Sequence, residues 1–130
     1  MKGKMKMKAI SQKSQKVLET LISKMEYGYA KIDNSNGAFM PVIVEAIGDD
    51  CFSVAHYYKQ NGDLIPDPEM VFWKGDDGKF YPTYFKNVFG EQETVLFENG
   101  KPSGIFQRLQ SEQATFANQW LANIKEQQGV

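Results

Sequence analysis

The feature that most constrains the fold is the segment of residues 51–73, in which two strand-like runs flank a turn. The runs 51–58 and 69–73 are rich in β-branched and aromatic residues, and Asn61-Gly62-Asp63 lies between them. An Asn-Gly pair between two such runs is typical of a β-hairpin. We therefore predict that this segment forms the central hairpin of an antiparallel sheet, with its ladder broken near Pro66 and Pro68.

Further strand-like runs surround this hairpin, at residues 29–33, 40–47, 80–85, 91–98 and 105–106. Most of them are separated by turn-forming residues, and Pro82 indicates an edge position or a bulge in its strand. The last two runs are joined by Asn99-Gly100, which again predicts a hairpin.

Helices are predicted at both ends of the chain. Residues 12–26 carry an apolar stripe that is typical of an amphipathic helix, with Ser11 or Ser14 as its cap and Gly28 as its end. Residues 111–127 repeat the pattern, with Ser111 as the cap and Trp120 as the main anchor. The order of helix, strands and helix predicts an α+β fold: an antiparallel sheet of five to seven strands with an N-terminal and a C-terminal helix packed on it.

A chain of 130 residues fits one domain. We expect a flexible basic arm at residues 1–10 and a single α+β domain at residues 11–128. One cysteine, Cys51, excludes an intrachain disulfide and a cysteine-based zinc cage, and it indicates a reducing cytoplasm. No signal peptide or membrane-spanning run is found, so we expect a cytoplasmic protein that does not contact a membrane.

The net charge of −1 conceals a strong asymmetry. Residues 1–44 have a balance of +5, whereas residues 45–98 carry eleven acids against four lysines. An acidic centre repels phosphates, so we expect nucleic acid to bind only through the basic arm, by Lys2, Lys4, Lys6 and Lys8.

One cluster in the central hairpin has the chemistry of a metal or acid–base site: His56, Asp63, Asp67 and Glu69. Carboxylates are ligands for Mg²⁺, Mn²⁺ or Ca²⁺, and a nearby histidine can act as a ligand or general base. Turn chemistry explains the same carboxylates, and a straight strand separates His56 from Asp63 by about 20 Å. A structural hairpin is therefore favoured over a partner-binding surface and over a metal or catalytic site, and no cofactor is expected.

Aromatic side chains provide a second candidate surface. A sheet of this size cannot easily hide all its rings, and we expect Trp73, Tyr81 and Tyr84 to be exposed beside acidic turns. Exposed rings rimmed by charge are typical of protein-binding faces. The candidate binding residues are then His56, Tyr57, Asp63, Asp67, Glu69, Trp73, Tyr81 and Tyr84.

Two blocks carry a family resemblance, His56-Tyr57-Tyr58-Lys59-Gln60-Asn61-Gly62-Asp63 and Asp67-Pro68-Glu69-Met70-Val71-Phe72. Together with the terminal helix around Trp120, they resemble an uncharacterised domain family of bacterial plasmids, integrative elements and phages. The resemblance covers about residues 40–128. It implies a mobile-element context and transfers no activity to any residue.

These observations favour a non-enzymatic accessory protein of a mobile element that binds another protein through an acidic, aromatic sheet surface. Inhibition of a host defence nuclease is one concrete form of that function. The alternative is a metal-dependent hydrolase or nuclease that uses His56, Asp63, Asp67 and Glu69. The sequence leaves the oligomeric state open.

Overall fold

The computed structural model describes residues 6–130, and within them lie two α-helices and eight β-strands. The helices are α1 (Gln12–Ser23) and α2 (Gln107–Gln128). The strands are β1 (Tyr29–Ile32), β2 (Val42–Gly48), β3 (Cys51–Gln60), β4 (Asp63–Lys74), β5 (Phe80–Asn87), β6 (Gly90–Glu93), β7 (Val95–Glu98) and β8 (Lys101–Ile105).

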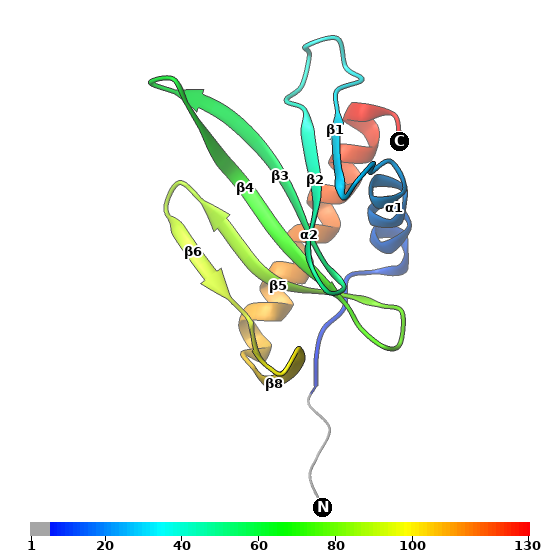
Figure 1. Ribbon diagram of the computed structural model, residues 1–130, viewed down its shortest axis with the longest axis vertical. Helices are drawn as coiled ribbons and strands as arrows, with labels where there is room; N and C mark the ends of the chain where they lie inside the picture. The colour runs from blue at the N-terminus through cyan, green and yellow to red at the C-terminus, as the bar shows by residue number, and fades with distance from the viewer. Residues whose placement is uncertain (1–5) are drawn as a thin grey trace, which may run out of the picture.

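The first six strands form one antiparallel sheet in the order β1-β2-β3-β4-β5-β6, so every strand pairs with its neighbour in sequence. Strands β7 and β8 form a separate hairpin below it (Figure 1). The predicted α+β class is confirmed, with an N-terminal and a C-terminal helix and an antiparallel sheet between them in sequence.

Both helices contribute to one apolar core on one face of the sheet. Figure 1 shows α2 running behind the strands and α1 beside β1. Leu18 and Leu21 of α1 and Leu121 and Ile124 of α2 are fully buried in this core. The sheet contributes alternate residues of its strands to the same core, including Val42, Val44, Val54, Met70 and Phe72.

The opposite face of the sheet carries no helix, and we call it the open face. Because side chains alternate along a strand, the residues between the core positions point to this side. The register aligns them in rows across the sheet, one of which runs Lys31, Ile43, Ala55, Glu69, Lys86, Glu91. A second row runs Tyr29, Glu45, Ser53, Val71, Tyr84, Glu93.

The central hairpin is confirmed, but its second strand is longer than predicted. Strand β4 continues through Pro66 and Pro68 instead of being broken there. The register steps from Ala55 opposite Glu69 to Tyr57 opposite Pro66, which is a β-bulge. The peptide bond between Asp67 and Pro68 in this bulge is cis.

Both helices begin or end where the sequence did not predict. Helix α1 ends at Ser23, before Tyr27 and Gly28 take up positive φ angles of 55° and 77°. Its cap is Ser11, whose hydroxyl accepts a hydrogen bond from the Ser14 N–H at 3.1 Å. Helix α2 begins four residues before the predicted Ser111, which therefore lies inside it.

The run predicted as one strand at residues 91–98 is divided at Thr94. This residue is fully buried, and its hydroxyl donates to the Pro82 carbonyl at 2.7 Å. Its own N–H donates to the Thr83 carbonyl at 2.9 Å. These bonds separate β6, in the large sheet, from β7 in the hairpin.

Part of the predicted basic arm is attached to the domain. The Lys8 N–H donates to Gln110 Oε1 at 2.7 Å, and the Ile10 N–H donates to the Phe80 carbonyl at 3.0 Å. The Ile10 side chain is buried in the core. Lys2 and Lys4 lie outside the described residues.

Candidate functional site

The open face contains a hollow of about 420 Å³ between β1, β2 and β3. We call it the hollow. It is lined by Tyr29, Lys31, Pro41, Ile43, Glu45, Tyr57, Lys59 and Leu64. These side chains meet because β1 pairs with β2, β2 with β3, and the start of β4 with the end of β3. The hollow thus joins apolar side chains to two tyrosine rings and both signs of charge.

Tyr57 is the half-buried aromatic group of the hollow. Burial raises the pKa of its phenol, and the nearby carboxylates of Glu69 and Glu45 raise the pKa further. The hydroxyl therefore stays protonated at neutral pH and can donate a hydrogen bond to an occupant. Lys31 and Lys59 are exposed, and neither belongs to an ion pair found within residues 6–130.

Beyond the hollow, the open face becomes acidic. Glu69 of β4, Glu91 and Glu93 of β6, and Asp77 of the loop before β5 form what we call the acidic flank. On the strands of this side, Lys86 alone among the described open-face residues carries a positive charge. The open face is therefore dipolar, with lysines at β1 and β3 and carboxylates at β4 and β6.

The acidic flank holds its tyrosines by hydrogen bonds. The Tyr84 hydroxyl donates to Glu91 Oε2, and the Tyr81 hydroxyl donates to Asp77 Oδ2. Burial, the hydrogen bond and the adjacent carboxylate raise the pKa of Tyr81 to about 12, and the same effects at Glu91 raise the pKa of Tyr84. These phenols are fixed donors to carboxylates rather than free groups.

Trp73 completes an aromatic cluster at the lower end of the open face. Its ring centroid lies 5.9 Å from that of Tyr81 and 5.9 Å from that of Phe97 on β7. Trp73, Tyr81 and Tyr84 are only partly exposed, less than the sequence led us to expect. The packing of Phe97 on Trp73 and the hydrogen bonds of the tyrosines cover much of their surface, and neither could be inferred from local sequence.

His56 lies on the helix-covered side of the sheet and is only 6% exposed. Its ring packs against Trp120 of α2, and its Nδ1 donates to the Pro41 carbonyl at 3.1 Å. Burial lowers the pKa of the imidazole, and the hydrogen bond to Pro41 opposes that shift only in part. His56 is therefore a neutral structural residue in the core.

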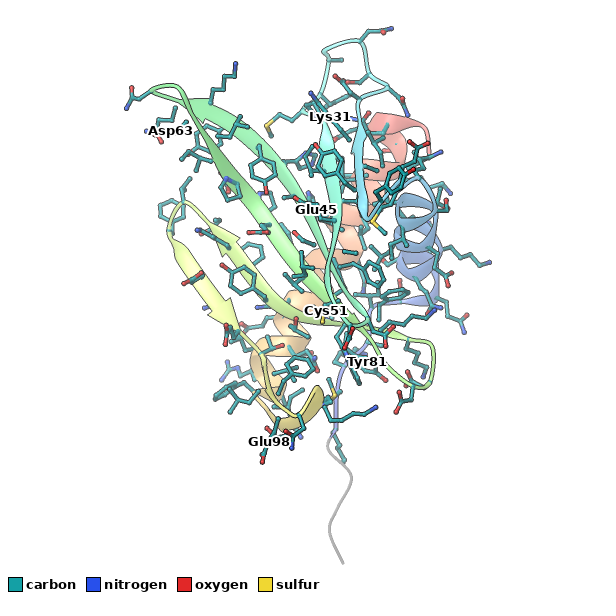
Figure 2. The ribbon with its side chains drawn as sticks, in the orientation of Figure 1. Lys31, Glu45, Cys51, Asp63, Tyr81 and Glu98 are labelled. Atoms are coloured by element: carbon teal, nitrogen blue, oxygen red, sulfur yellow. The ribbon has the colours of Figure 1, made fainter. Side chains whose placement is uncertain are left out.

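The carboxylates of the predicted cluster are dispersed. Asp63 is exposed at the tip of the β3–β4 hairpin (Figure 2), and Asp67 lies in the β-bulge. Glu69 accepts a hydrogen bond from the Ser53 hydroxyl at 2.9 Å on the open face. Within residues 6–130, no group of three or more His, Cys, Asp or Glu side chains is arranged to hold a metal ion.

Of the predicted binding residues, Tyr57, Glu69, Trp73, Tyr81 and Tyr84 share the open face, whereas His56 does not. Sequence reasoning missed the other residues of the hollow, which are Tyr29, Lys31, Pro41, Ile43, Glu45, Lys59 and Leu64. The signal for them in the sequence is the alternation of apolar and polar residues along β1 and β2. This alternation identifies a shared surface only when the pairing of β1 with β2 is known.

The fold and its surface define a class: a small α+β domain with two helices on one side of a six-stranded meander and a dipolar face on the other. Over residues 6–130, the chain matches the family model described as "Domain of unknown function (DUF6908)". The protein belongs to this family. No curated protein and no solved structure matches this chain. Neither α1 nor α2 has the length and hydropathy needed to cross a membrane.

Proposed function

We propose that this protein is a non-enzymatic accessory protein of a mobile genetic element and that it binds another protein through the open face. One observation carries this proposal: the acidic flank and the aromatic side chains of Trp73, Tyr81 and Tyr84 lie together on the open face, where hydrogen bonds and packing hold the rings in place. Aromatic groups supply contact area at low entropic cost, and the carboxylates supply charge complementarity to a basic partner. The mobile-element context comes from the resemblance of the two sequence blocks in β3 and β4.

The partner that fits an acidic flank best is a protein with a basic groove for nucleic acid. Carboxylates at positions that phosphates would otherwise occupy can compete for the same lysines and arginines. A host nuclease that attacks foreign DNA has such a groove, so inhibition of a host defence nuclease is the specific form we propose. Attraction between charged surfaces is screened by salt, which makes this binding sensitive to ionic strength.

The test is a pull-down from host lysate at low salt, followed by a nuclease assay on the captured protein. The double variant Glu91→Lys/Glu93→Lys should lose the captured nuclease and its inhibition. Its matched control, Glu19→Lys/Glu126→Lys, makes the same change of charge at exposed positions of the two helices and should retain both. Equal capture by the two double variants would contradict binding through the acidic flank.

The alternative, a metal-dependent hydrolase that uses His56, Asp63, Asp67 and Glu69, receives less support. His56 packs against α2, and Asp63 ends the hairpin, so a shared ion would require a large rearrangement. Calorimetric titration with Mg²⁺, Mn²⁺ and Zn²⁺ tests it. A saturable heat that Glu69→Gln abolishes would favour this alternative over protein binding.

A further inference from the structure

The turn between β5 and β6 presents an unusually exposed aromatic side chain. Phe89 is 93% exposed, and its neighbour Val88 is 53% exposed. The two strands that carry the turn lie at one edge of the sheet, and the turn itself projects away from both helices (Figure 1). Water solvates a phenyl ring poorly, so a contact that covers Phe89 would be favourable.

The hollow has the shape and lining to receive such a ring. Pro41, Ile43 and Leu64 supply apolar contacts, and the Tyr57 ring adds an aromatic wall. The volume of about 420 Å³ exceeds what one phenyl ring needs. Leu64 is itself 62% exposed, so the occupant would also cover an apolar side chain of the hollow.

The charges beside the turn complement those beside the hollow. Glu91 and Glu93 follow Phe89 on β6, whereas Lys31 and Lys59 line the hollow. Within one chain these groups cannot meet, because β1 and β6 are opposite edges of the sheet. Five inter-strand spacings separate them, which is about 24 Å.

A two-fold axis parallel to the strands resolves this separation. Such an axis places β6 of each copy over β1 of the other, so the same contact forms two times. The strand directions of two sheets packed face to face in this way differ by no more than about 30°. The row that begins at Lys31 ends at Glu91, so the two residues lie at the same level of the sheet. The turn that carries Phe89 extends one step beyond this row, towards the level of Tyr57 in the hollow.

We propose that two copies of this chain pack their open faces together about this axis, each inserting Phe89 into the hollow of the other. Glu91 of one copy then lies beside Lys31 of the second, at the same level of the sheet. This inference goes beyond the proposed function, because it concerns the protein without its partner. The partner and the second copy compete for the open face, and the dimer keeps the apolar hollow covered until the partner displaces it.

The first test is the mass of the pure protein in solution, by sedimentation and by light scattering after size exclusion. The wild-type protein should be a dimer that dissociates on dilution, and Phe89→Ser should raise its dissociation constant at least tenfold. The matched control is Tyr27→Ser, which removes another fully exposed ring, in the loop between α1 and β1. A wild-type monomer throughout the micromolar range, or equal effects of the two variants, would overturn the proposal.

The second test uses the two-fold symmetry. Lys31→Glu and Glu91→Lys should each weaken the dimer, because each creates two like-charge contacts. An equimolar mixture of these two variants should associate again, since every pair at the interface then has opposite signs. If the mixture associates no better than either variant alone, the proposed packing is wrong. No partner protein enters either test, so failure here leaves the proposed function to its own experiment.

Discussion

The imidazole of His56 packs edge-on against the indole of Trp120, with ring centroids 5.6 Å apart and planes at 73°. This contact joins the centre of the sheet to α2. It also explains why the one histidine of the chain serves the core rather than a site. His56, the candidate ligand, and Trp120, the predicted helix anchor, thus pack directly against each other.

Burial of His56 predicts a pH dependence of stability. The folded-state pKa lies below the ordinary histidine value of about 6.5, so the unfolded chain takes up the proton first as the pH falls. The neutral imidazole of His56 therefore makes its full contribution to the free energy of unfolding above pH 6.5. This contribution is lost as the pH falls from 6.5 towards the lowered folded-state pKa. One proton gives a limiting slope of about 1.4 kcal/mol per pH unit.

The variant His56→Gln isolates this effect. Glutamine keeps an N–H that can donate to the Pro41 carbonyl, but it does not titrate. Urea unfolding between pH 8 and pH 5 should show a shallower decline in the free energy of unfolding for the variant than for the wild type. Parallel curves would mean that His56 is not the titrating group.

A second prediction compares two buried glutamines of α2. Gln110 is fully buried, accepts from the Lys8 N–H at 2.7 Å and donates to the Pro82 carbonyl at 3.0 Å. Gln113 donates to the Gln92 carbonyl at 3.1 Å, while its buried Oε1 has no partner within residues 6–130. Loss of the two Gln110 hydrogen bonds should lower the free energy of unfolding by about 2 kcal/mol. Loss of Gln113 removes one hydrogen bond but also a buried unpaired oxygen, so it should change the free energy of unfolding little.

The variants are Gln110→Leu and Gln113→Leu, compared by chemical denaturation. We expect the first to lower the free energy of unfolding clearly more than the second. The reverse order would show that the Gln113 carbonyl is satisfied in solution, for instance by water. Amide exchange at Lys8 should also accelerate in the Gln110 variant alone.

The Tyr81–Asp77 hydrogen bond predicts a tyrosine that titrates late. Burial and then the bond to Asp77 raise the pKa of Tyr81 to about 12. Because the folded-state pKa lies above the ordinary value of about 10, this contribution to stability is present below pH 10 and is lost as the pH rises towards 12. In an absorbance titration of the phenolates, Tyr81→Phe should remove one late transition, and Asp77→Asn should move it to lower pH. A titration curve unchanged by both variants would exclude the bond.

Cys51 should react slowly with thiol reagents. Burial raises the pKa of its thiol, and the carboxylates of Asp50 and Asp49 raise the pKa further, so little thiolate is present at neutral pH. With a disulfide reagent at pH 8, we expect a lower rate than for free cysteine, and a few-fold increase for Asp49→Asn/Asp50→Asn. In urea, the wild-type rate should rise to that of free cysteine. A fast reaction of the native protein would contradict this account.

The central hairpin was predictable because its signals are local. Asn61 and Gly62 adopt positive φ angles of 53° and 88°, which these residue types favour, and the flanking strands pair as the alternation requires. The start of α2 was not predictable from Ser111, a good cap by type. The helix instead begins earlier, where the Gln110 N–H donates to the Phe106 carbonyl and the Gln110 side chain is buried between distant segments.

The candidate site depends still more on tertiary contacts. The hollow requires β1, β2 and β3 side by side, and its residues span positions 29 to 64 of the chain. The dispersal of His56, Asp63 and Glu69 likewise follows from a β-bulge and from the strand alternation that sends His56 to the helix side. Composition and charge predicted the acidic centre, but only the register shows that β1 and β3 bring lysines to the same face.

The position of α2 at the end of the chain has a consequence for biosynthesis. All six strands of the large sheet precede it, and each pairs with a sequence neighbour, so the sheet can assemble as the chain emerges. Helix α1 can cover part of its apolar side early, but the part that α2 covers stays exposed until the last turns of α2 have been translated, because Trp120, Leu121 and Ile124 lie there. A nascent chain stalled before these residues would expose an apolar sheet surface, to which chaperones at the ribosome exit can bind.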